Sequence, residues 1–219
     1  MLTYEQIKAN EDIKTYIEKA DESLTALGFT EHSFAHVTRV SETAKYILET
    51  LGYPQRTIEL AQIAGYLHDI GNLVNRVDHS QSGAVMAFRI LDKMGMDAEE
   101  ISTIVTAIGN HDEGTGVPVN AVAAALILAD KADVRRSRVR NQDFSTFDIH
   151  DRVNYSVTAS KLVLDTEQKT ATLTLSIDTE VASVMSYFEI FLGRMMMCRG
   201  AAGMLGAKFK LMANGSKVL

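Results

Sequence analysis

The stretch IELAQIAGYLHDIG, residues 58–71, decides how the N-terminal part of this chain folds. Its first ten residues are apolar on almost every side, which is typical of a helix buried among other helices. The helix is expected to end at the adjacent pair His68-Asp69, with Gly71 as its stop. Burying an imidazole beside a carboxylate is unfavourable unless a partner binds them. Since both groups are ligands of divalent metal ions, the pair is a candidate metal site.

Composition sets the class of protein. The chain has 219 residues, a net charge of -6 and a single cysteine. An acidic balance argues against a nucleic-acid partner, and one cysteine excludes an intramolecular disulfide and fits a reducing compartment. Residues 1–20 lack the pattern of a signal peptide, and no apolar run of about 20 residues occurs. We therefore expect a cytoplasmic protein with no membrane partner.

Apolar residues recur at helical spacing through the first 133 residues. This periodicity predicts helices over Thr3–Gly28, Ser33–Leu51, Pro54–Asp69, 85–95, Asp97–Asn110 and 119–133. His79 is expected in a short polar segment before the fourth of these helices. Residues 135–152 are polar and without periodicity, so a linker or mobile loop is expected there.

The pattern changes after residue 155. Residues 156–164 are rich in Val, Thr and Leu, and residues 170–177 alternate apolar and polar side chains, which predicts two strands joined by a hairpin at 165–169. A helix over 181–199 and a strand over 208–212 should follow. The predicted fold is mainly α: a helical domain over residues 1–150, then a small α+β unit with a β-hairpin over 151–219.

Further metal-ligand candidates lie at the ends of the predicted helices. His36 begins one helix, His79 precedes another, His111 follows a third, and Asp130 lies in the last turn of a fourth. Helix ends far apart in sequence can meet at one pocket. A divalent ion in such a pocket activates water, which is otherwise a poor nucleophile toward a phosphoester.

The order His36, His68-Asp69, Asp130 resembles the signature of the HD superfamily of metal-dependent phosphohydrolases. The flanks His36-Val37-Thr38-Arg39-Val40 and 128–133 (LADKAD) are also similar to the segments of that family. The resemblance covers residues 32–140 and implies an HD-type helical bundle. It further implies that His36, His68, Asp69 and Asp130 hold one divalent ion.

Two more histidines resemble ligands for a second ion. The segments His79-x-x-x-Gly83-Ala84 and Asn110-His111 are similar to those of bacterial symmetrical diadenosine tetraphosphate hydrolases. Residues 114–118 (GTGVP) are partly similar to the loop of HD-GYP phosphodiesterases, with Val117 where that loop has tyrosine. The resemblance implies that Asp69, His79 and His111 hold the second ion, with Asp69 bridging the two. One or two ions are expected, from among Fe, Mn, Mg, Co, Ni and Zn.

The resemblance implies a phosphohydrolase that cleaves a phosphoester or phosphoanhydride of a nucleotide or dinucleotide, by attack of a metal-activated hydroxide. Asp69 would be catalytic as the bridging ligand. Lys131, Arg135 and Arg136 lie just beyond Asp130 and are hypothesised to neutralise phosphate oxygens, since guanidinium groups match phosphate geometry, and Arg76 is a further candidate. Arg138 and Arg140 extend this basic cluster, which would either contact phosphate or form a solvated arm.

Two alternatives use the same residues. A non-catalytic regulatory module would bind a nucleotide or metal without turnover, and a di-iron oxygenase would use the same ligand types for other chemistry. His32 is expected to cap a helix or face water, and His150 to have no chemical role. The C-terminal unit is expected either to select the substrate or to form a homodimer through the Met-rich helix around Met195–Met197.

Overall fold

The computed structural model describes all residues, 1–219, and its helices follow the apolar periodicity of the sequence. The helices of the N-terminal part are α1 (Tyr4–Ala9), α2 (Glu11–Ala26), α3 (Phe34–Thr50), α4 (Gln55–Leu67), α5 (His79–Lys93), α6 (Ala98–Gly109) and α7 (Ala121–Ala132). The short 3-10 helix η1 (Ile70–Leu73) follows α4. The predicted mainly helical fold with a small β unit is confirmed.

Side-chain caps set where most of these helices begin. Thr3 and Gln6 form the expected capping box at α1, because each side chain bonds the backbone of the other residue. The predicted first helix is nevertheless two helices, since Asn10 ends α1 and its side chain caps α2 by accepting from the Ile13 amide. Gly28, with φ +80°, follows the end of α2.

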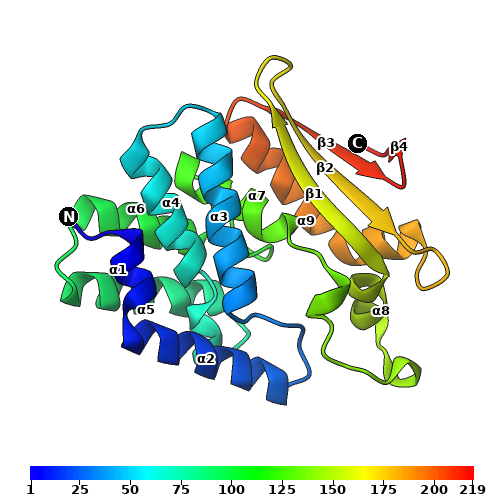
Figure 1. The fold of residues 1–219 in the computed structure, drawn as a ribbon, viewed down its shortest axis with the longest axis horizontal. Coiled ribbons are helices and arrows are strands. Elements are labelled where there is room, and N and C mark those ends of the chain that lie inside the picture. The colour runs from blue at the N-terminus through cyan, green and yellow to red at the C-terminus, as the bar shows by residue number, and fades with distance from the viewer.

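Helix α7 is the central element of the molecule. It packs against α3, α4 and α6 on one side and against α9 (Val184–Met204) on the other. In Figure 1 it lies between the N-terminal helices and the C-terminal sheet. Residues Val122–Ala129 are all buried, so this helix has no solvent-facing side until Asp130. Asp130 therefore follows directly on a segment that is packed on all sides.

The C-terminal unit is a four-stranded sheet with one covering helix. Its strands are β1 (Val157–Asp165), β2 (Thr170–Ile177), β3 (Lys208–Ala213) and β4 (Ser216–Lys217), in that order across the sheet. The hairpin β1–β2 is antiparallel, with Leu162 opposite Leu173, whereas β2 and β3 are parallel and are joined by the crossover helix α9. The alternation over 170–177 points its apolar side chains inward.

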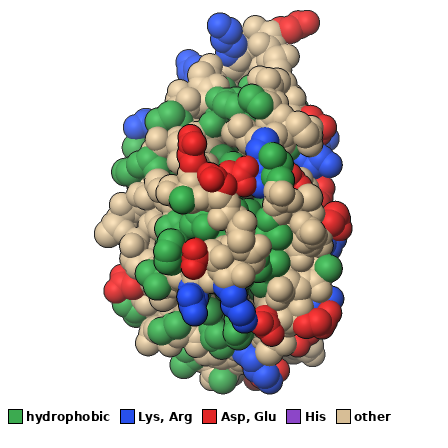
Figure 2. Space-filling view, turned by 90° about the vertical axis from the view of Figure 1, so that its left-hand side faces the viewer, with side chains coloured by type: hydrophobic (Ala, Val, Ile, Leu, Met, Phe, Trp, Pro, Cys, Tyr) green, Lys and Arg blue, Asp and Glu red, His purple; other side chains and the backbone are tan.

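One apolar core runs from the helical part into the sheet. The predicted domain boundary at residue 150 stays a prediction, while α7 and α9 pack directly across it. None of the helices combines the length and the apolar character needed to traverse a lipid bilayer. Figure 2 shows the face at the left of Figure 1, where acidic, basic and apolar side chains are interspersed and no histidine is visible.

Two expectations about local structure were wrong. His79 is the first residue of α5 rather than part of a preceding loop. The segment 135–152 is also structured, with 3-10 helices η2 (Arg136–Arg138) and η3 (Phe144–Thr146) and the start of α8 (Ile149–Ser156). Asp148 caps α8 by accepting from the Asp151 amide. Helix caps and ion pairs hold this segment in place. Because these contacts are polar, they leave no apolar periodicity in the sequence from which the structure could be predicted.

Candidate metal centre

The end of α4 turns His68 and Asp69 toward the interior. Helix α4 stops at Leu67, and the chain tightens into η1 immediately after Asp69. Gly71 allows α5 to approach this turn, because a Cβ atom there would lie 2.0 Å from the His79 carbonyl oxygen and 2.4 Å from the Gly83 nitrogen. A glycine is therefore needed for His79 to reach Asp69.

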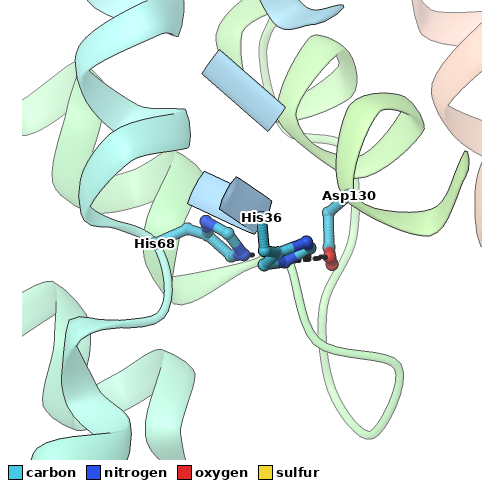
Figure 3. Close-up of side chains that lie close together, drawn as sticks. All are labelled: His36, His68 and Asp130. Carbon is cyan, nitrogen blue, oxygen red and sulfur yellow. Dashed lines mark ion pairs between the residues drawn. The ribbon is translucent and has the colours of Figure 1, made fainter. Parts of the chain in front are cut away.

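His36, His68, Asp69 and Asp130 form the first cluster. The His36 Nε2 lies 3.4 Å from both Asp69 Oδ2 and Asp130 Oδ1. The His68 Nε2 lies 3.2 Å from Asp69 Oδ2 and 3.7 Å from Asp130 Oδ1. Figure 3 shows His36, His68 and Asp130 pointing toward one another from three different helix ends. Ligand atoms of these three residues all lie within 4.8 Å of one another.

A second cluster shares Asp69 with the first. The His79 Nε2 lies 3.5 Å from Asp69 Oδ1 and 3.2 Å from the Nε2 of His111. Atoms of His68, Asp69 and His111 also lie within 4.8 Å of one another. The six residues that the sequence proposed as metal ligands are thus brought together in one place, with Asp69 between the two groups.

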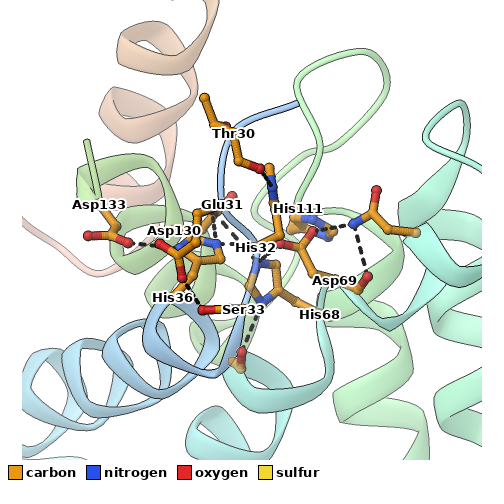
Figure 4. Close-up of polar contacts among 12 residues, drawn as sticks. Thr30, Glu31, His32, Ser33, His36, His68, Asp69, His111, Asp130 and Asp133 are labelled. Atoms are coloured by element: carbon orange, nitrogen blue, oxygen red, sulfur yellow. Dashed lines mark hydrogen bonds and ion pairs between the residues drawn. The ribbon is translucent and has the colours of Figure 1, made fainter. Parts of the chain in front are cut away.

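The Nδ1 atom of every one of these imidazoles already has a partner. His68, His79 and His111 each face a backbone carbonyl oxygen, of Gly65 at 2.8 Å, Arg76 at 3.1 Å and Ile108 at 2.6 Å. His36 Nδ1 faces Asp133 Oδ2 at 2.8 Å, a contact drawn in Figure 4.

A carbonyl oxygen only accepts hydrogen bonds, so Nδ1 must donate, and the Nε2 of a neutral ring is left as an acceptor. In the neutral form of each ring, the Nε2 lone pair points at a carboxylate oxygen or at another ring. The Nε2 atoms of His36 and His68 and the Oδ2 of Asp69 are buried without a hydrogen-bond partner. A group of acceptors that face one another fits a cation, and imidazole with carboxylate is a donor set for divalent metal ions.

Electrostatics in the cluster agree with this fit. Burial alone would raise the pKa of the Asp130 carboxyl, but Lys131 and the imidazoles of His36 and His68 hold it well below its usual value. Burial alone would likewise raise the pKa of the Asp69 carboxyl. The neighbouring imidazoles, of which His68 has the largest effect, hold that pKa well below its usual range. Burial, His68 and Lys131 lower the pKa of His111 to about 3, so this ring is a neutral potential ligand.

His36 behaves differently from His111. Burial and Arg138 disfavour its charged form, but the carboxylates of Asp130, Asp133 and Asp69 raise its pKa to about 9. The negative potential at this point is therefore strong enough to hold a proton on a buried imidazole, and the same potential would attract a metal ion.

The clusters open into a cavity of about 420 Å³. Asp69, His79, His111 and Asp130 line its inner end, and His32 and His150 also line it. With the buried His36 and His68, all six histidines of the chain lie at or directly behind this cavity. His32 was expected to cap a helix or face water, and His150 to have no chemical role, but both side chains line the cavity.

Comparison with known families agrees with this geometry. The protein-family model described as "HD domain" matches residues 33–143, just over half of the chain. The chain belongs to the HD domain family. The matched segment contains all six proposed ligands. It ends before α8, so α8, the sheet and α9 lie outside it.

Individual relatives of this HD protein are distant. An uncharacterised protein of Methanocaldococcus jannaschii, MJ1020, is 24% identical in an alignment of 161 positions, and the match covers 64% of this chain and 62% of the relative. The match thus spans less than two thirds of that relative. A crystal structure described as a predicted HD superfamily hydrolase, from an uncultured Thermotogales bacterium, is 28% identical, with a TM-score of 0.44. That comparison covers 57% of this chain and 67% of the other.

The three basic residues beyond Asp130 that were proposed to contact phosphate occupy different places in this protein. Lys131 is buried and lines the cavity, with its Nζ 2.8 Å from Asp130 Oδ2 and 3.3 Å from Glu113 Oε2. Arg135 does not line the cavity and is paired with Asp133 and Glu31.

Arg136 also lies away from the cavity lining. Its Nη2 is 2.8 Å from Asp178 Oδ2, and its guanidinium lies over the ring of Tyr155. Of Lys131, Arg135 and Arg136, the structure brings only Lys131 to the cavity, and the further candidate Arg76 also lines it.

Two more arginines line the cavity: Arg138, which belongs to the basic cluster noted in the sequence, and Arg194, which sequence reasoning missed. Arg138 is buried and bonds the backbone oxygens of Glu31 and Asp133. Arg194 comes from α9, more than sixty residues after the last proposed ligand. It is one of three charged residues, with Glu189 and Arg199, that interrupt the apolar run 181–205, and nothing in the sequence distinguishes it from the other two.

Proposed function

We propose that this HD protein is a metal-dependent phosphohydrolase acting on a phosphoester or phosphoanhydride of a nucleotide. One observation carries the proposal: two groups of Nε2 and carboxylate acceptors meet at Asp69, at the inner end of a cavity that also presents buried Lys131. The first group combines a metal-ligand set with a cation that complements phosphate oxygens, which is the combination that phosphoryl transfer to water needs.

The ligand roles follow from the contacts. His36, His68, Asp69 and Asp130 would hold one ion, and Asp69, His79 and His111 would hold a second. A bound divalent ion supplies Lewis-acid polarisation of a phosphoryl oxygen and of the attacking water.

The remaining steps belong to protein side chains. Lys131 places a positive charge beside Asp130, where it would neutralise charge that develops on the phosphoryl oxygens in the transition state. Asp133 holds the His36 ring, and the carbonyl oxygens of Gly65 and Ile108 hold His68 and His111, so that the Nε2 atoms keep their direction.

Size and polarity of the cavity support a nucleotide-sized substrate. A volume of about 420 Å³ is within the range of small-molecule sites, and apolar side chains contribute only Leu27, Phe29 and Phe191 to the lining. The remaining lining is mostly charged or hydrogen bonding, which suits an anionic substrate better than a lipid or an apolar one.

The test measures metal content and phosphate release together. Purified protein is analysed for bound metals, then assayed for phosphate release from mono-, cyclic and dinucleotides with each candidate ion. Asp69→Asn should abolish turnover and lower the metal content while the circular dichroism spectrum stays folded. Asp92→Asn, an exposed position on α5, is the matched control and should behave like the wild type.

Other outcomes separate the alternatives. Tight nucleotide binding with no release of phosphate from any substrate contradicts hydrolysis and favours a regulatory module. Consumption of oxygen with an organic co-substrate, in an iron-loaded protein that leaves phosphoesters intact, favours a di-iron oxygenase.

A further inference from the structure

Arg194 differs from the other arginines of the cavity in what its guanidinium contacts. Its Nε lies 2.5 Å from Glu113 Oε1, while its two terminal amino groups, Nη1 and Nη2, make no hydrogen bond with the protein. Arg138 uses Nε and Nη1 on backbone oxygens, and Arg76 donates from Nη1 to the Asn72 side chain. Arg76 also has Nη2 free, so what distinguishes Arg194 is that both of its terminal amino groups are without a protein partner.

The position of this guanidinium is fixed from two sides. Its central carbon lies 4.4 Å from the centroid of the Phe191 ring, one helical turn earlier on α9. Glu113 holds the Nε edge. A planar fork that is already oriented loses little conformational freedom when it binds an anion, which favours recognition of phosphate oxygens.

Arg194 is connected to the metal centre through a short series of ion pairs. Glu113 Oε2 lies 3.3 Å from Lys131 Nζ, and this Nζ lies 2.8 Å from Asp130 Oδ2. The carboxylate of Glu113 thus holds two cations that both line the cavity. Its own charge is retained, because Lys131 and Arg194 outweigh the effect of burial and lower the pKa of Glu113 to about 2.

We propose that Arg194 is a substrate-binding residue that recognises a phosphate or pyrophosphate group through Nη1 and Nη2. The proposal deepens the proposed function and rests on it for the identity of the substrate. It assigns a role to the C-terminal unit: α9, which lies outside the matched HD segment, supplies an anion-binding side chain to the site.

The test is calorimetric titration of inorganic phosphate and pyrophosphate into the full chain, with Mn²⁺ and after chelation. Arg194→Gln should weaken binding at least about tenfold in both conditions, because a charge-assisted, forked contact is lost. Arg194→Lys keeps the charge but not the fork and should weaken binding by several-fold. Arg199→Gln, at an exposed position on the same helix, should leave binding within twofold of the wild type.

Unchanged phosphate affinity in Arg194→Gln overturns the inference, as does a wild-type protein that binds neither anion. A lower melting temperature with unchanged affinity would mean that Arg194 only ties α9 to Glu113, which also overturns it. If the glutamine variant does not fold, the lysine variant decides. Phosphate binding through Arg194 without turnover on any substrate would contradict the proposed hydrolase and leave this inference standing.

Discussion

The Nε2 atoms of His79 and His111 lie 3.2 Å apart, although the Nδ1 of each ring faces a backbone carbonyl oxygen. Burial is the main reason that the pKa of each ring is lowered, so both rings tend to be neutral. Two neutral rings in this arrangement direct lone pairs at each other, which is unfavourable unless a cation lies near both. The pair therefore gives a direct reason to expect metal-dependent stability.

Adding a divalent ion should raise the melting temperature. At a metal concentration of one hundred times the dissociation constant, binding to the native state stabilises it by about 2.7 kcal/mol. For a chain of this length the shift is about 5–10 °C. Differential scanning fluorimetry with Mn²⁺, Fe²⁺, Mg²⁺, Co²⁺, Ni²⁺ and Zn²⁺, and with a chelator, measures it. Asp69→Asn should lose most of the shift; equal melting temperatures under all conditions would contradict a metal site.

Asp133 should control metal affinity without touching the metal. Its Oδ2 accepts from His36 Nδ1 at 2.8 Å, and replacing it with Asn leaves a weaker, uncharged partner for that ring. Supporting contacts of this kind change metal affinity by about 10- to 100-fold. Competition with a fluorescent chelator should show this loss in Asp133→Asn.

The matched control for that experiment is Asp178→Asn, which breaks the ion pair with Arg136 away from the cavity. Its metal affinity should stay within twofold of the wild type. An Asp133→Asn protein that binds metal as tightly as this control would show that the second contact on His36 is unimportant.

Gly71→Ala should destabilise the protein strongly. The new Cβ would lie 2.0 Å from the His79 carbonyl oxygen and 2.4 Å from the Gly83 nitrogen, and neither backbone atom can move without shifting α5. We expect a loss of at least about 3 kcal/mol, or roughly 6–12 °C in melting temperature. The variant should also lose metal, because His79 moves with α5.

Gly193→Ala provides the opposite case on α9. No atom lies within 4 Å of its Cβ position, and its backbone is helical. Replacing glycine by alanine there should stabilise the protein by about 0.5–1 kcal/mol. If both alanine variants melt at the same temperature, the close approach at Gly71 does not constrain the fold.

Cys198 should be unreactive in the native protein. The side chain is buried, and burial is the main cause that raises the pKa of its thiol to about 12. At pH 8 roughly one thiol in 10⁴ would be ionised, and the thiolate is the reactive form. A disulfide-exchange reagent should label the chain only after denaturant is added. Rapid stoichiometric labelling under native conditions would contradict this burial.

The sequence predicted those parts of the structure that depend on local patterns. Helix α7 and strand β2 were found because each has an apolar pattern of helical or alternating period. The positions of His36 and His68-Asp69 at helix ends followed from the same patterns. Their meeting with Asp130 was implied by resemblance, because no local pattern encodes a contact across ninety residues.

The missed features depend on ion pairs, on packing between distant helices and on a helix cap. Arg135 was proposed for phosphate from its place after Asp130, but Asp133 and Glu31 bind it. Arg194 reaches the cavity only because α9 packs on α7. Helix α8 has only eight residues, which is too few for its apolar period to be recognised, although Asp148 and Asp151 have the spacing of a cap and could have predicted its start.

Because every imidazole of the chain lies at this cavity or directly behind it, the ring protons of histidine form a built-in reporter group. A nuclear magnetic resonance spectrum selective for imidazole carries no background from elsewhere in this protein. Titrating a diamagnetic ion such as Zn²⁺ or Mg²⁺ would then reveal, ring by ring, the order in which the two clusters fill, without isotope labelling of any other residue type.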